Sequence, residues 1–338
     1  MKNAGTLSEN TITQYGVKLG FGIQILMLCF AVTYRFRKLM DMTNKELEER
    51  VKKRTEKIQI QNREIILQRD YLNYQKEKLE IQRKEIINSI EYAQRIQNAL
   101  LPTERFISKM FLDGFLLFKP RNIVSGDFYW ISKKEGLTIL VAADCTGHGV
   151  PGALMSMLGI SFLNEIINRV VIYNKEIKPH EILNELTNYI TGTLTFNDHK
   201  ENVKDGIDMG VCVFNHANSL LFYSGARRPM YHVRNSKLTT YKGDRLTVGY
   251  NFNRLSNFTT HRIEIKEGDI IYLFSDGYID QIGEKSKKTF RTQRFKNLLK
   301  SIYAHPMEEQ QKVLEETFNQ WKGKEEQIDD VLVIGVKF

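Results

Sequence analysis

The stretch VAADCTGHGVPG, at residues 141–152, decides the fold and the chemistry that we expect of this chain. An apolar run, Leu137–Ala143, predicts a strand, and it delivers a carboxylate at Asp144 before the chain breaks into a glycine-rich turn. A strand that ends in this way can present an acidic group at the edge of a sheet. We therefore expect Asp144 to face a reaction centre.

Three further acidic sites lie at predicted strand ends. They are Asp127 within SGDFYW, Asp276 after the apolar run Ile270–Phe274, and the pair Asp329 and Asp330 before the closing apolar run. A single Asp-Gly pair is a common turn signal, but four such sites in this order and context are far more specific. The pattern predicts one cage lined with carboxylate oxygens.

The ligand type indicates what this cage would hold. Carboxylates without accompanying Cys or His pairs suit hard cations such as Mg²⁺ or Mn²⁺ rather than zinc. Two such ions that share a carboxylate can clamp a phosphoryl group and activate a water molecule. The chemistry that we expect is therefore hydrolysis of a phosphate ester without a protein nucleophile.

At these residues the sequence resembles the PPM (PP2C-like) metal-dependent phosphatases, most closely the bacterial SpoIIE/RsbU branch. The resemblance covers about residues 89–338 and is carried by SGDFYW, ADCTGHGVPGALMSMLG, DGIDMGVCVFN, YSGARRPMY, GDIIYLFSDGYID and DDVLVIGV. It implies that two Mn²⁺ or Mg²⁺ ions are held by Asp127, Asp144, Asp276 and Asp329, with Asp144 bridging. It also implies a ligand from the backbone carbonyl of Cys145, and it makes Asp330 a less favoured ligand than Asp329.

The rest of this region predicts an α+β domain at residues 103–338. Strands are expected at 115–118, 128–132, 137–143, 210–215, 219–224, 229–234, 259–265, 270–275 and 330–337, and helices at 151–173, 179–194, 294–302 and 307–322. The resemblance implies an α-β-β-α sandwich of two mainly antiparallel sheets flanked by helices.

Composition allows one substantial domain with appendages, since the chain has 338 residues and 42% of them are hydrophobic. The net charge of +9 comes largely from residues 35–84, so we read it as the flank of a membrane segment and not as a nucleic-acid surface. The three scattered cysteines indicate a reduced, cytosolic catalytic part. Cys145 lacks the C-x5-R pattern of cysteine phosphatases, because Pro151 stands where Arg would be required.

Residues 19–38 predict a membrane anchor. The uncharged run LGFGIQILMLCFAVTY reaches the lower limit for a spanning helix, and Arg35, Arg37 and Lys38 follow at once. This order predicts a single-pass protein of the bacterial inner membrane, with residues 1–18 outside and the catalytic domain in the cytoplasm. A buried helix of a soluble protein is the alternative. The segment also resembles the last transmembrane helix of the 7TMR-DISM sensors, so the chain could be a truncated relative of a larger sensor.

Residues 39–102 predict a long signalling helix. Apolar residues recur every seven positions, although the second seam is polar, which favours a parallel homodimeric coiled coil over a solvated charged spacer. The helix is expected to end near Pro102, and the resemblance makes SIEYAQRIQNALLP, just before the catalytic domain, a regulatory helix. The heptad residues are Val51, Ile58, Ile65, Leu72, Leu79, Ile86, Ala93 and Leu100.

Several other residues have open interpretations. His148 could pass a proton to the leaving oxygen or could only set its turn, and Arg121 could contact phosphate or remain a solvated loop cation. Asp205 and Asp208 could support a third metal, but we favour turn residues. The pair Arg227 and Arg228 could recognise a partner, and we favour a plain basic loop.

The function that we expect is a membrane-tethered protein serine/threonine phosphatase, in which a metal-bound hydroxide attacks the phosphate directly. Within the resembled branch, substrates are commonly phosphoserine or phosphothreonine on STAS-type anti-sigma antagonists, so a STAS-domain protein is the expected partner. The alternatives are a catalytically silent PP2C-like binding module and a histidine kinase fragment. Retention of all four acids argues against the first, and the lack of paired glycine-rich nucleotide boxes argues against the second.

Overall fold

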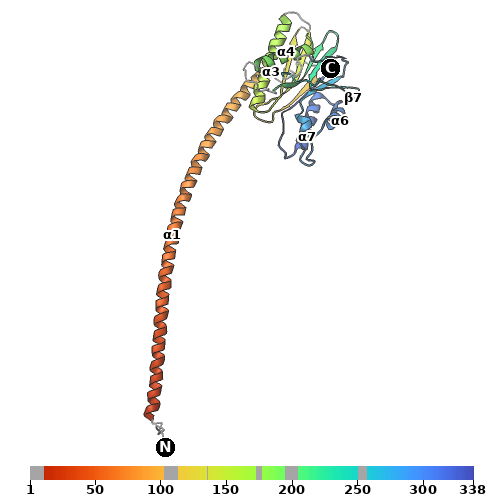
Figure 1. Ribbon diagram of the computed structural model, residues 1–338. Helices are drawn as coiled ribbons and strands as arrows, with labels where there is room; N and C mark the ends of the chain where they lie inside the picture. The colour runs from red at the N-terminus through yellow and green to blue at the C-terminus, as the bar shows by residue number, and fades with distance from the viewer. Residues whose placement is uncertain (1–10, 103–112, 135, 173–176, 195–204, 250–256) are drawn as a thin grey trace. The chain divides into compact units, whose positions relative to one another are not determined.

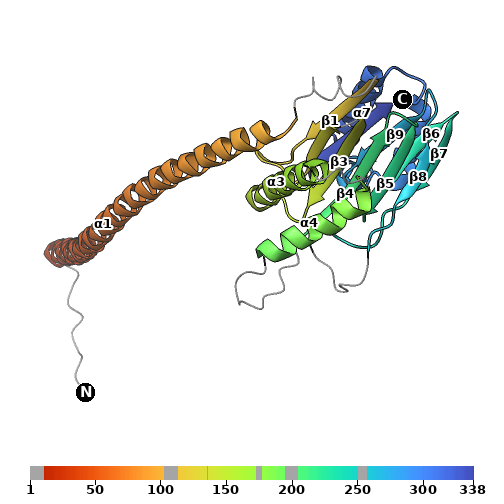
Figure 2. The same ribbon diagram turned by 90° about the horizontal axis from the view of Figure 1, so that it is seen from above.

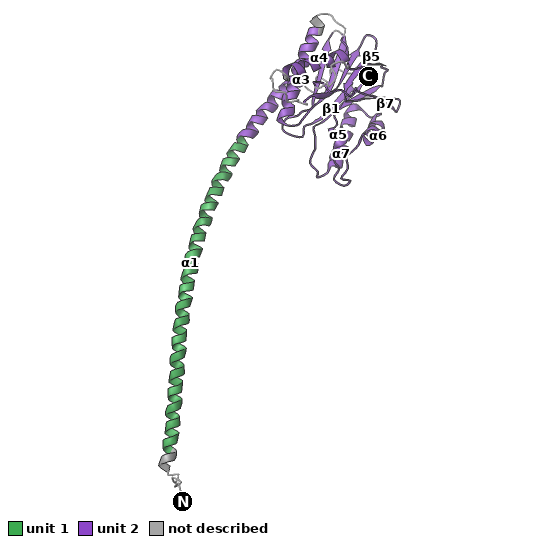
Figure 3. Cartoon of the chain, in the orientation of Figure 1, with its two compact units in different colours: residues 1–84 green, residues 85–338 purple. Residues whose placement is uncertain are grey.

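The computed structural model describes residues 11–102, 113–134, 136–172, 177–194, 205–249 and 257–338. The chain divides into two compact units, Met1–Lys84 and Glu85–Phe338, which Figure 3 shows in green and purple.

The first unit is helical. Its described residues belong to α1, a continuous helix over Thr11–Leu100 whose last turns lie in the second unit. The heptad residues Val51, Ile58, Ile65, Leu72 and Leu79 are all more than half exposed. An apolar stripe on such a helix requires another surface to bury it, so the coiled coil and the membrane span stay predictions.

The second unit contains two antiparallel five-stranded sheets (Figures 1 and 2). In the first sheet the strand order is β2, β3, β4, β5, β8, and in the second it is β1, β10, β9, β6, β7. The strands of the first sheet are β2 (Phe128–Lys134), β3 (Leu137–Cys145), β4 (Ile207–Asn215), β5 (Leu220–Ala226) and β8 (His261–Glu264). Those of the second are β1 (Asp113–Lys119), β6 (Met230–Arg234), β7 (Lys237–Tyr241), β9 (Ile270–Phe274) and β10 (Val331–Lys337).

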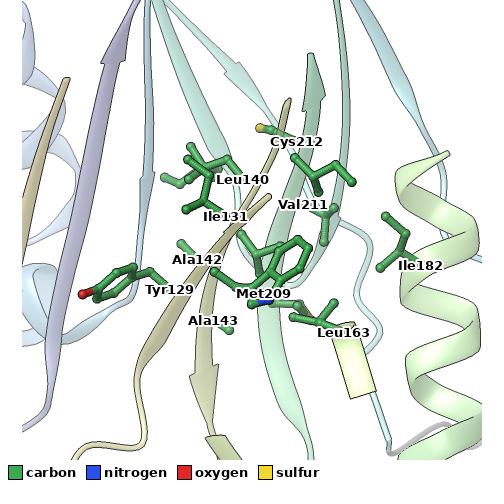
Figure 4. Packing of buried hydrophobic residues seen from close by; sticks show 14 of the residues in the cluster. Tyr129, Ile131, Leu140, Ala142, Ala143, Leu163, Ile182, Met209, Val211 and Cys212 are labelled. Carbon is green, nitrogen blue, oxygen red and sulfur yellow. The ribbon is translucent and has the colours of Figure 1, made fainter. Parts of the chain in front are cut away.

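Helices cover both sheets, because each sheet is apolar on both faces and must bury them. The helices α3 (Val150–Ile172) and α4 (Pro179–Leu194) pack on the first sheet, and Figure 4 shows Leu163 and Ile182 in one cluster with Met209 and Val211 of β4. The helices α6 (Thr292–Ile302) and α7 (Met307–Lys322) pack on the second sheet through Phe295, Leu299, Leu314 and Phe318, next to the short α5 (Gly277–Asp280).

This architecture confirms the expected α+β fold with two antiparallel sheets. The nine predicted strands and four predicted helices are present, and α1 ends just before Pro102 as expected. The sequence pattern did not predict β7, whose residues Lys237–Tyr241 are polar and partly exposed at a sheet edge. It also did not predict α5, which is a single turn.

Two described helices are long and apolar enough to cross a membrane, one within α1 near the N-terminus and one at Val150–Arg169. Half of the second helix's apolar window is buried inside the domain, as expected for a core helix, whereas the window in α1 is fully exposed. The apolar part of α1 is therefore the candidate anchor, on length and composition alone.

Candidate functional site

The topology brings the predicted acids to one end of the two sheets. Asp127 precedes β2 and Asp144 is near the end of β3, and these antiparallel strands place Phe128 opposite Ala143. In the other sheet β9 and β10 pair in the same way, so Asp276, after β9, lies near Asp329 and Asp330, before β10. Two antiparallel strand pairs, one from each sheet, thus contribute the carboxylates.

Asp127 is the most buried of these acids. Its side chain is 2% exposed, and its Oδ2 has no hydrogen-bond partner. Burial raises the pKa of Asp127 well above its usual range, and the nearby charge of Asp144 raises it further, while a hydrogen bond with the Ser275 side chain opposes the shift. A buried carboxylate with an unsatisfied oxygen requires a positive partner.

Asp144 and Asp276 share a contact with Arg228. The Arg228 Nη2 atom contacts Asp144 Oδ2, lies 2.7 Å from Asp276 Oδ2 and is 3.8 Å from Asp208 Oδ2. Burial raises the pKa of Asp144 well above its usual value; Arg228 opposes this shift and the charge of Asp276 adds to it. One guanidinium therefore offsets only part of the negative charge in this cluster.

Asp329 and Asp330 differ in what their oxygens contact. Burial raises the pKa of Asp329, although the Asp330 N–H donates to its Oδ1 at 2.8 Å. Asp330 is 2% exposed, and its two oxygens accept hydrogen bonds from the backbone N–H groups of Arg121, at 2.6 Å, and Gly126, at 2.7 Å. Asp330 thus fixes the loop before Asp127, and the preference for Asp329 as a ligand stays a prediction.

Glycines allow the two loops that carry Asp127 and Asp144 to touch. A Cβ at Gly126 would lie 2.6 Å from the Gly147 carbonyl oxygen, and a Cβ at Gly152 would lie 2.4 Å from the same atom. Gly147 itself has a φ of 87°, which favours glycine. The glycine-rich sequence is therefore required for the close approach of backbone at this site.

Cys145 follows Asp144 at the end of β3. Its side chain is buried, and burial followed by the charges of Asp144 and Asp127 raises the pKa of its thiol well above the ordinary value. The thiol therefore stays protonated at neutral pH, which agrees with the rejection of a cysteine-phosphatase reading. Only its backbone carbonyl was predicted to take part.

His148 and Arg121 are both exposed at the edge of the acidic cluster. The charge of His148 acts to lower the pKa of Asp329, so the imidazole lies within electrostatic reach of the cluster. Arg121 is tied to the cluster through its backbone N–H, which donates to Asp330 Oδ1. Their proposed contacts with substrate remain predictions.

Arg228 and Asp208 are the site residues that the sequence analysis misjudged. The interpretation of Arg228 as a plain basic loop is wrong, because its side chain is 14% exposed and ion-paired, whereas Arg227 is exposed as expected. Asp208 is no turn residue: it lies within β4 directly opposite Asp144 and accepts a hydrogen bond from Thr247 at 2.8 Å. The sequence did offer one indication of this role: like the acids, Arg228 lies just beyond the end of a strand, in this case β5.

Gln97, near the end of α1, is tied to the loop of Asp127. Its side chain is 2% exposed; Nε2 donates to the Ser125 carbonyl at 2.6 Å and to Ser156 Oγ at 2.8 Å, and Oε1 accepts from the Ser125 N–H at 3.1 Å. Both backbone groups of Ser125 are thus held by one amide from the helix. This residue was not singled out from the sequence, since nothing in a charged helix marks one glutamine.

The donor set fits a hard divalent cation. It consists of carboxylate oxygens that repel one another, and one of them is buried without a partner. Over the described ranges, no three carboxylate, imidazole or thiol side chains are arranged as a ready metal site, and Arg228 Nη2 contacts both Asp144 and Asp276. Ion binding would therefore require local rearrangement of these side chains.

A protein-family comparison assigns the chain. The model for Stage II sporulation protein E (SpoIIE) matches residues 134–338. The chain belongs to the SpoIIE family. A search of curated proteins found no match.

Solved structures agree with membership in the SpoIIE family. The SiaA-PP2C domain of Pseudomonas aeruginosa is 28% identical with a TM-score of 0.67, over 76% of this chain and 98% of that one. The PP2C domain and regulatory fragment of SpoIIE from Bacillus subtilis is 16% identical with a TM-score of 0.53, over 67% and 63%. The RsbU and RsbW domains of a Mycobacterium tuberculosis protein are 18% identical with a TM-score of 0.53, over 67% and 59%. The last two show the shared fold alone, and together these findings establish a PP2C-type phosphatase domain.

Proposed function

We propose that this SpoIIE-family chain is a metal-dependent protein serine/threonine phosphatase. The observation that carries the proposal is the convergence of Asp127, Asp144, Asp276 and Asp329 from both sheets, with burial raising the pKa of three of them. Groups whose charges are this poorly offset cluster at functional sites. Bound divalent cations would offset the repulsion between these carboxylates.

The chain's own residues would divide the work. The four aspartates, with the backbone carbonyl of Cys145, would hold two Mn²⁺ or Mg²⁺ ions, and Asp144 would bridge them. These ions would supply Lewis acidity, which lowers the pKa of water and offsets charge on the phosphoryl group.

Neighbouring groups would orient this cluster. Ser275 fixes the Asp127 carboxylate, and Asp330 holds the backbone before it. His148, which is exposed and within electrostatic reach of Asp329, would give a proton to the leaving oxygen, and Arg121 would contact the substrate phosphate.

The chain's organisation supports a signalling role. We assign residues 1–18 to a short extracytoplasmic segment, 19–38 to a transmembrane helix, 39–102 to a dimeric signalling helix and 103–338 to the phosphatase domain. The exposed heptad stripe supports the homodimer, and the exposed apolar run supports a single-pass span of the inner membrane. The basic residues Arg35, Arg37 and Lys38 after the run support a cytoplasmic catalytic domain. Deletion of residues 41–80 should convert a dimer to a monomer in sedimentation, and unchanged sedimentation would contradict the dimer.

Regulation through the helix is supported by Gln97. Because its amide holds both backbone groups of Ser125, movement of the end of α1 would displace the loop that carries Asp127.

The substrate that we propose is a phosphoserine or phosphothreonine on a STAS-domain signalling protein, by analogy with the family branch. The second candidate, a catalytically silent partner-binding module, would keep the same fold.

The test is hydrolysis of p-nitrophenyl phosphate by the metal-stripped full chain. We expect no activity in excess chelator, recovery with Mn²⁺ or Mg²⁺, and loss of activity in Asp144→Asn with the fold intact. Asp113→Asn, which changes an exposed acid at the start of β1, is the matched control and should retain full activity. Activity that persists in chelator or in Asp144→Asn would overturn the mechanism, and a folded, metal-loaded, inactive wild type would favour the silent module. Consumption of ATP would identify a kinase instead.

A further inference from the structure

Arg228 enters the acidic cluster through a single nitrogen. Its ion pairs with Asp144, Asp276 and Asp208 all use Nη2, and its buried Nε has no hydrogen-bond partner. An arginine that is built into a permanent ion pair usually engages a carboxylate with two parallel N–H groups. Arg228 instead contacts the aspartates through one nitrogen, as a single positive charge.

The backbone of this residue is fixed, so the side chain is directed into the cluster. The Arg228 N–H donates to the Ala226 carbonyl at 2.6 Å, and the Arg228 carbonyl accepts from the Tyr223 hydroxyl. Gly225 and Gly243 leave room for that carbonyl, because a Cβ on either would lie within 2.5 Å of its oxygen. Only the flexible side chain is free to change position.

Arg228 contacts two of the carboxylates that would hold the divalent ions under the proposed function. Asp144 Oδ2 and Asp276 Oδ2 are its two nearest partners. A guanidinium carries one positive charge, whereas the cluster includes the carboxylates of Asp127, Asp144, Asp276 and Asp329. One cation cannot offset four carboxylates, but two divalent ions can.

We propose that Arg228 is an internal counter-ion that competes with the divalent ions for Asp144 and Asp276. In the metal-free protein its guanidinium stabilises the folded acidic cluster, and metal binding displaces it. The residue therefore sets the metal concentration at which the site is filled. This inference rests on the proposed function, because it requires that the cluster binds metal.

The test measures Mn²⁺ binding by calorimetry on the full chain, without any activity assay. Arg228→Gln is expected to bind Mn²⁺ about tenfold more tightly than the wild type and to melt at a lower temperature in chelator. Arg227→Gln is the matched control, since it removes the same charge from the adjacent exposed residue, and its Mn²⁺ affinity should change far less. Unchanged or weaker Mn²⁺ binding by Arg228→Gln would overturn the proposal, because loss of a merely structural contact would not tighten binding.

A second measurement uses only the wild type and so does not depend on the folding of a variant. Phenylglyoxal reacts with accessible guanidinium groups, and mass spectrometry gives the extent of modification at each arginine. We expect Mn²⁺ to increase the modification of Arg228 and to leave that of Arg227 unchanged. Equal or reduced modification of Arg228 would overturn displacement. The two proposals can fail separately. If the wild type hydrolyses a phosphate ester with Mn²⁺ but Arg228→Gln binds Mn²⁺ no more tightly, this inference alone is overturned. If neither protein binds Mn²⁺, the inference is overturned together with the proposed function.

Discussion

The two ends of β9 carry acids in opposite electrostatic situations, and the acid before the strand is buried whereas the acid after it is about one third exposed. Asp269, just before the strand, is 1% exposed and accepts hydrogen bonds from Arg234, at 2.7 Å on Oδ1, and from the Lys266 N–H, at 2.9 Å on Oδ2. Burial alone would raise its pKa, but these bonds lower the pKa below the usual value. Asp276, after the strand, shares one Arg228 nitrogen with Asp144, whose pKa is raised.

Asp269 is satisfied within the fold, whereas the acids at the other end are the candidates for binding a ligand. At Asp269 each oxygen has a partner within the protein, so nothing further is required. At the other end one buried oxygen of Asp127 has no partner and one guanidinium faces several carboxylates. Asp269, whose oxygens all have partners, is therefore a structural acid. The acids around Asp127 and Arg228, whose negative charges are only partly offset, are the candidates for metal binding.

The largest expected contrast is in activity. Asp276→Asn should reduce hydrolysis of a phosphate ester by more than about 100-fold, since even residues that only support metal ligands give losses up to that size. Asp269→Asn should leave the activity per folded molecule unchanged. Steady-state kinetics normalised to the folded fraction measure both, and equal losses in the two variants would remove the distinction between the two ends.

The free energy of unfolding should show the reverse order, with Asp269→Asn losing more than Asp276→Asn. Asp269→Asn weakens the ion pair with Arg234, and we expect a loss of about 2–3 kcal/mol in the free energy of unfolding. Because the pKa of Asp269 is lowered on folding, its stabilising effect is present above the ordinary value of 3.8 and is lost only as the pH falls through the folded pKa. The loss should therefore be present at pH 6 as well as at pH 8 in urea unfolding, and its disappearance at pH 6 would contradict this assignment.

Gln97 offers an intermediate effect at the acidic end. Gln97→Ala removes the bonds to both backbone groups of Ser125, and we expect about a tenfold higher Mn²⁺ requirement for activity, equivalent to the cost of leaving these groups unpaired. Asn98→Ala changes the neighbouring exposed side chain and should leave the requirement unaltered. Identical Mn²⁺ titrations for the two variants would show that Gln97 does not position the Asp127 loop.

The smallest effect concerns stability without metal. Asp127 has a raised pKa, so its ionisation destabilises the fold: stability is full below 3.8 and is lost as the pH rises through the folded pKa. Asp127→Asn removes this cost and should raise the melting temperature in chelator by roughly 2–4 °C at pH 8, with a smaller gain at pH 5. A lower melting temperature than wild type at pH 8 would show that the charge is satisfied within the protein.

The acidic half of the site could be predicted because its residues are tied to local pattern. Asp127, Asp144, Asp276 and Asp329 each border an apolar run that reads as a strand, and antiparallel pairing then brings those ends together. The two sheets and their helices follow from the same runs. The coiled coil and the membrane anchor were predicted from periodicity and composition, and an exposed helix neither confirms nor contradicts them.

What was missed depends on contacts between distant segments. In the sequence Arg228 looks like an ordinary loop cation. In the structure it lies in the connection from β5 to β6, where its side chain contacts the acidic cluster and is only 14% exposed. Gln97 is one of many polar residues in its helix, and only its burial against Ser125 distinguishes it. Such roles arise from tertiary packing, which has no signature in hydrophobic periodicity.

The central claim is that the acids from both sheets bind divalent ions, and anomalous diffraction from crystals soaked in Mn²⁺ tests it most directly. We predict two Mn²⁺ peaks roughly 3.5–4 Å apart, bridged by Asp144 and flanked by Asp127, Asp276 and Asp329, with the Arg228 guanidinium moved away. The absence of Mn²⁺ at this end of the sheets, with Arg228 still between Asp144 and Asp276, would contradict the account.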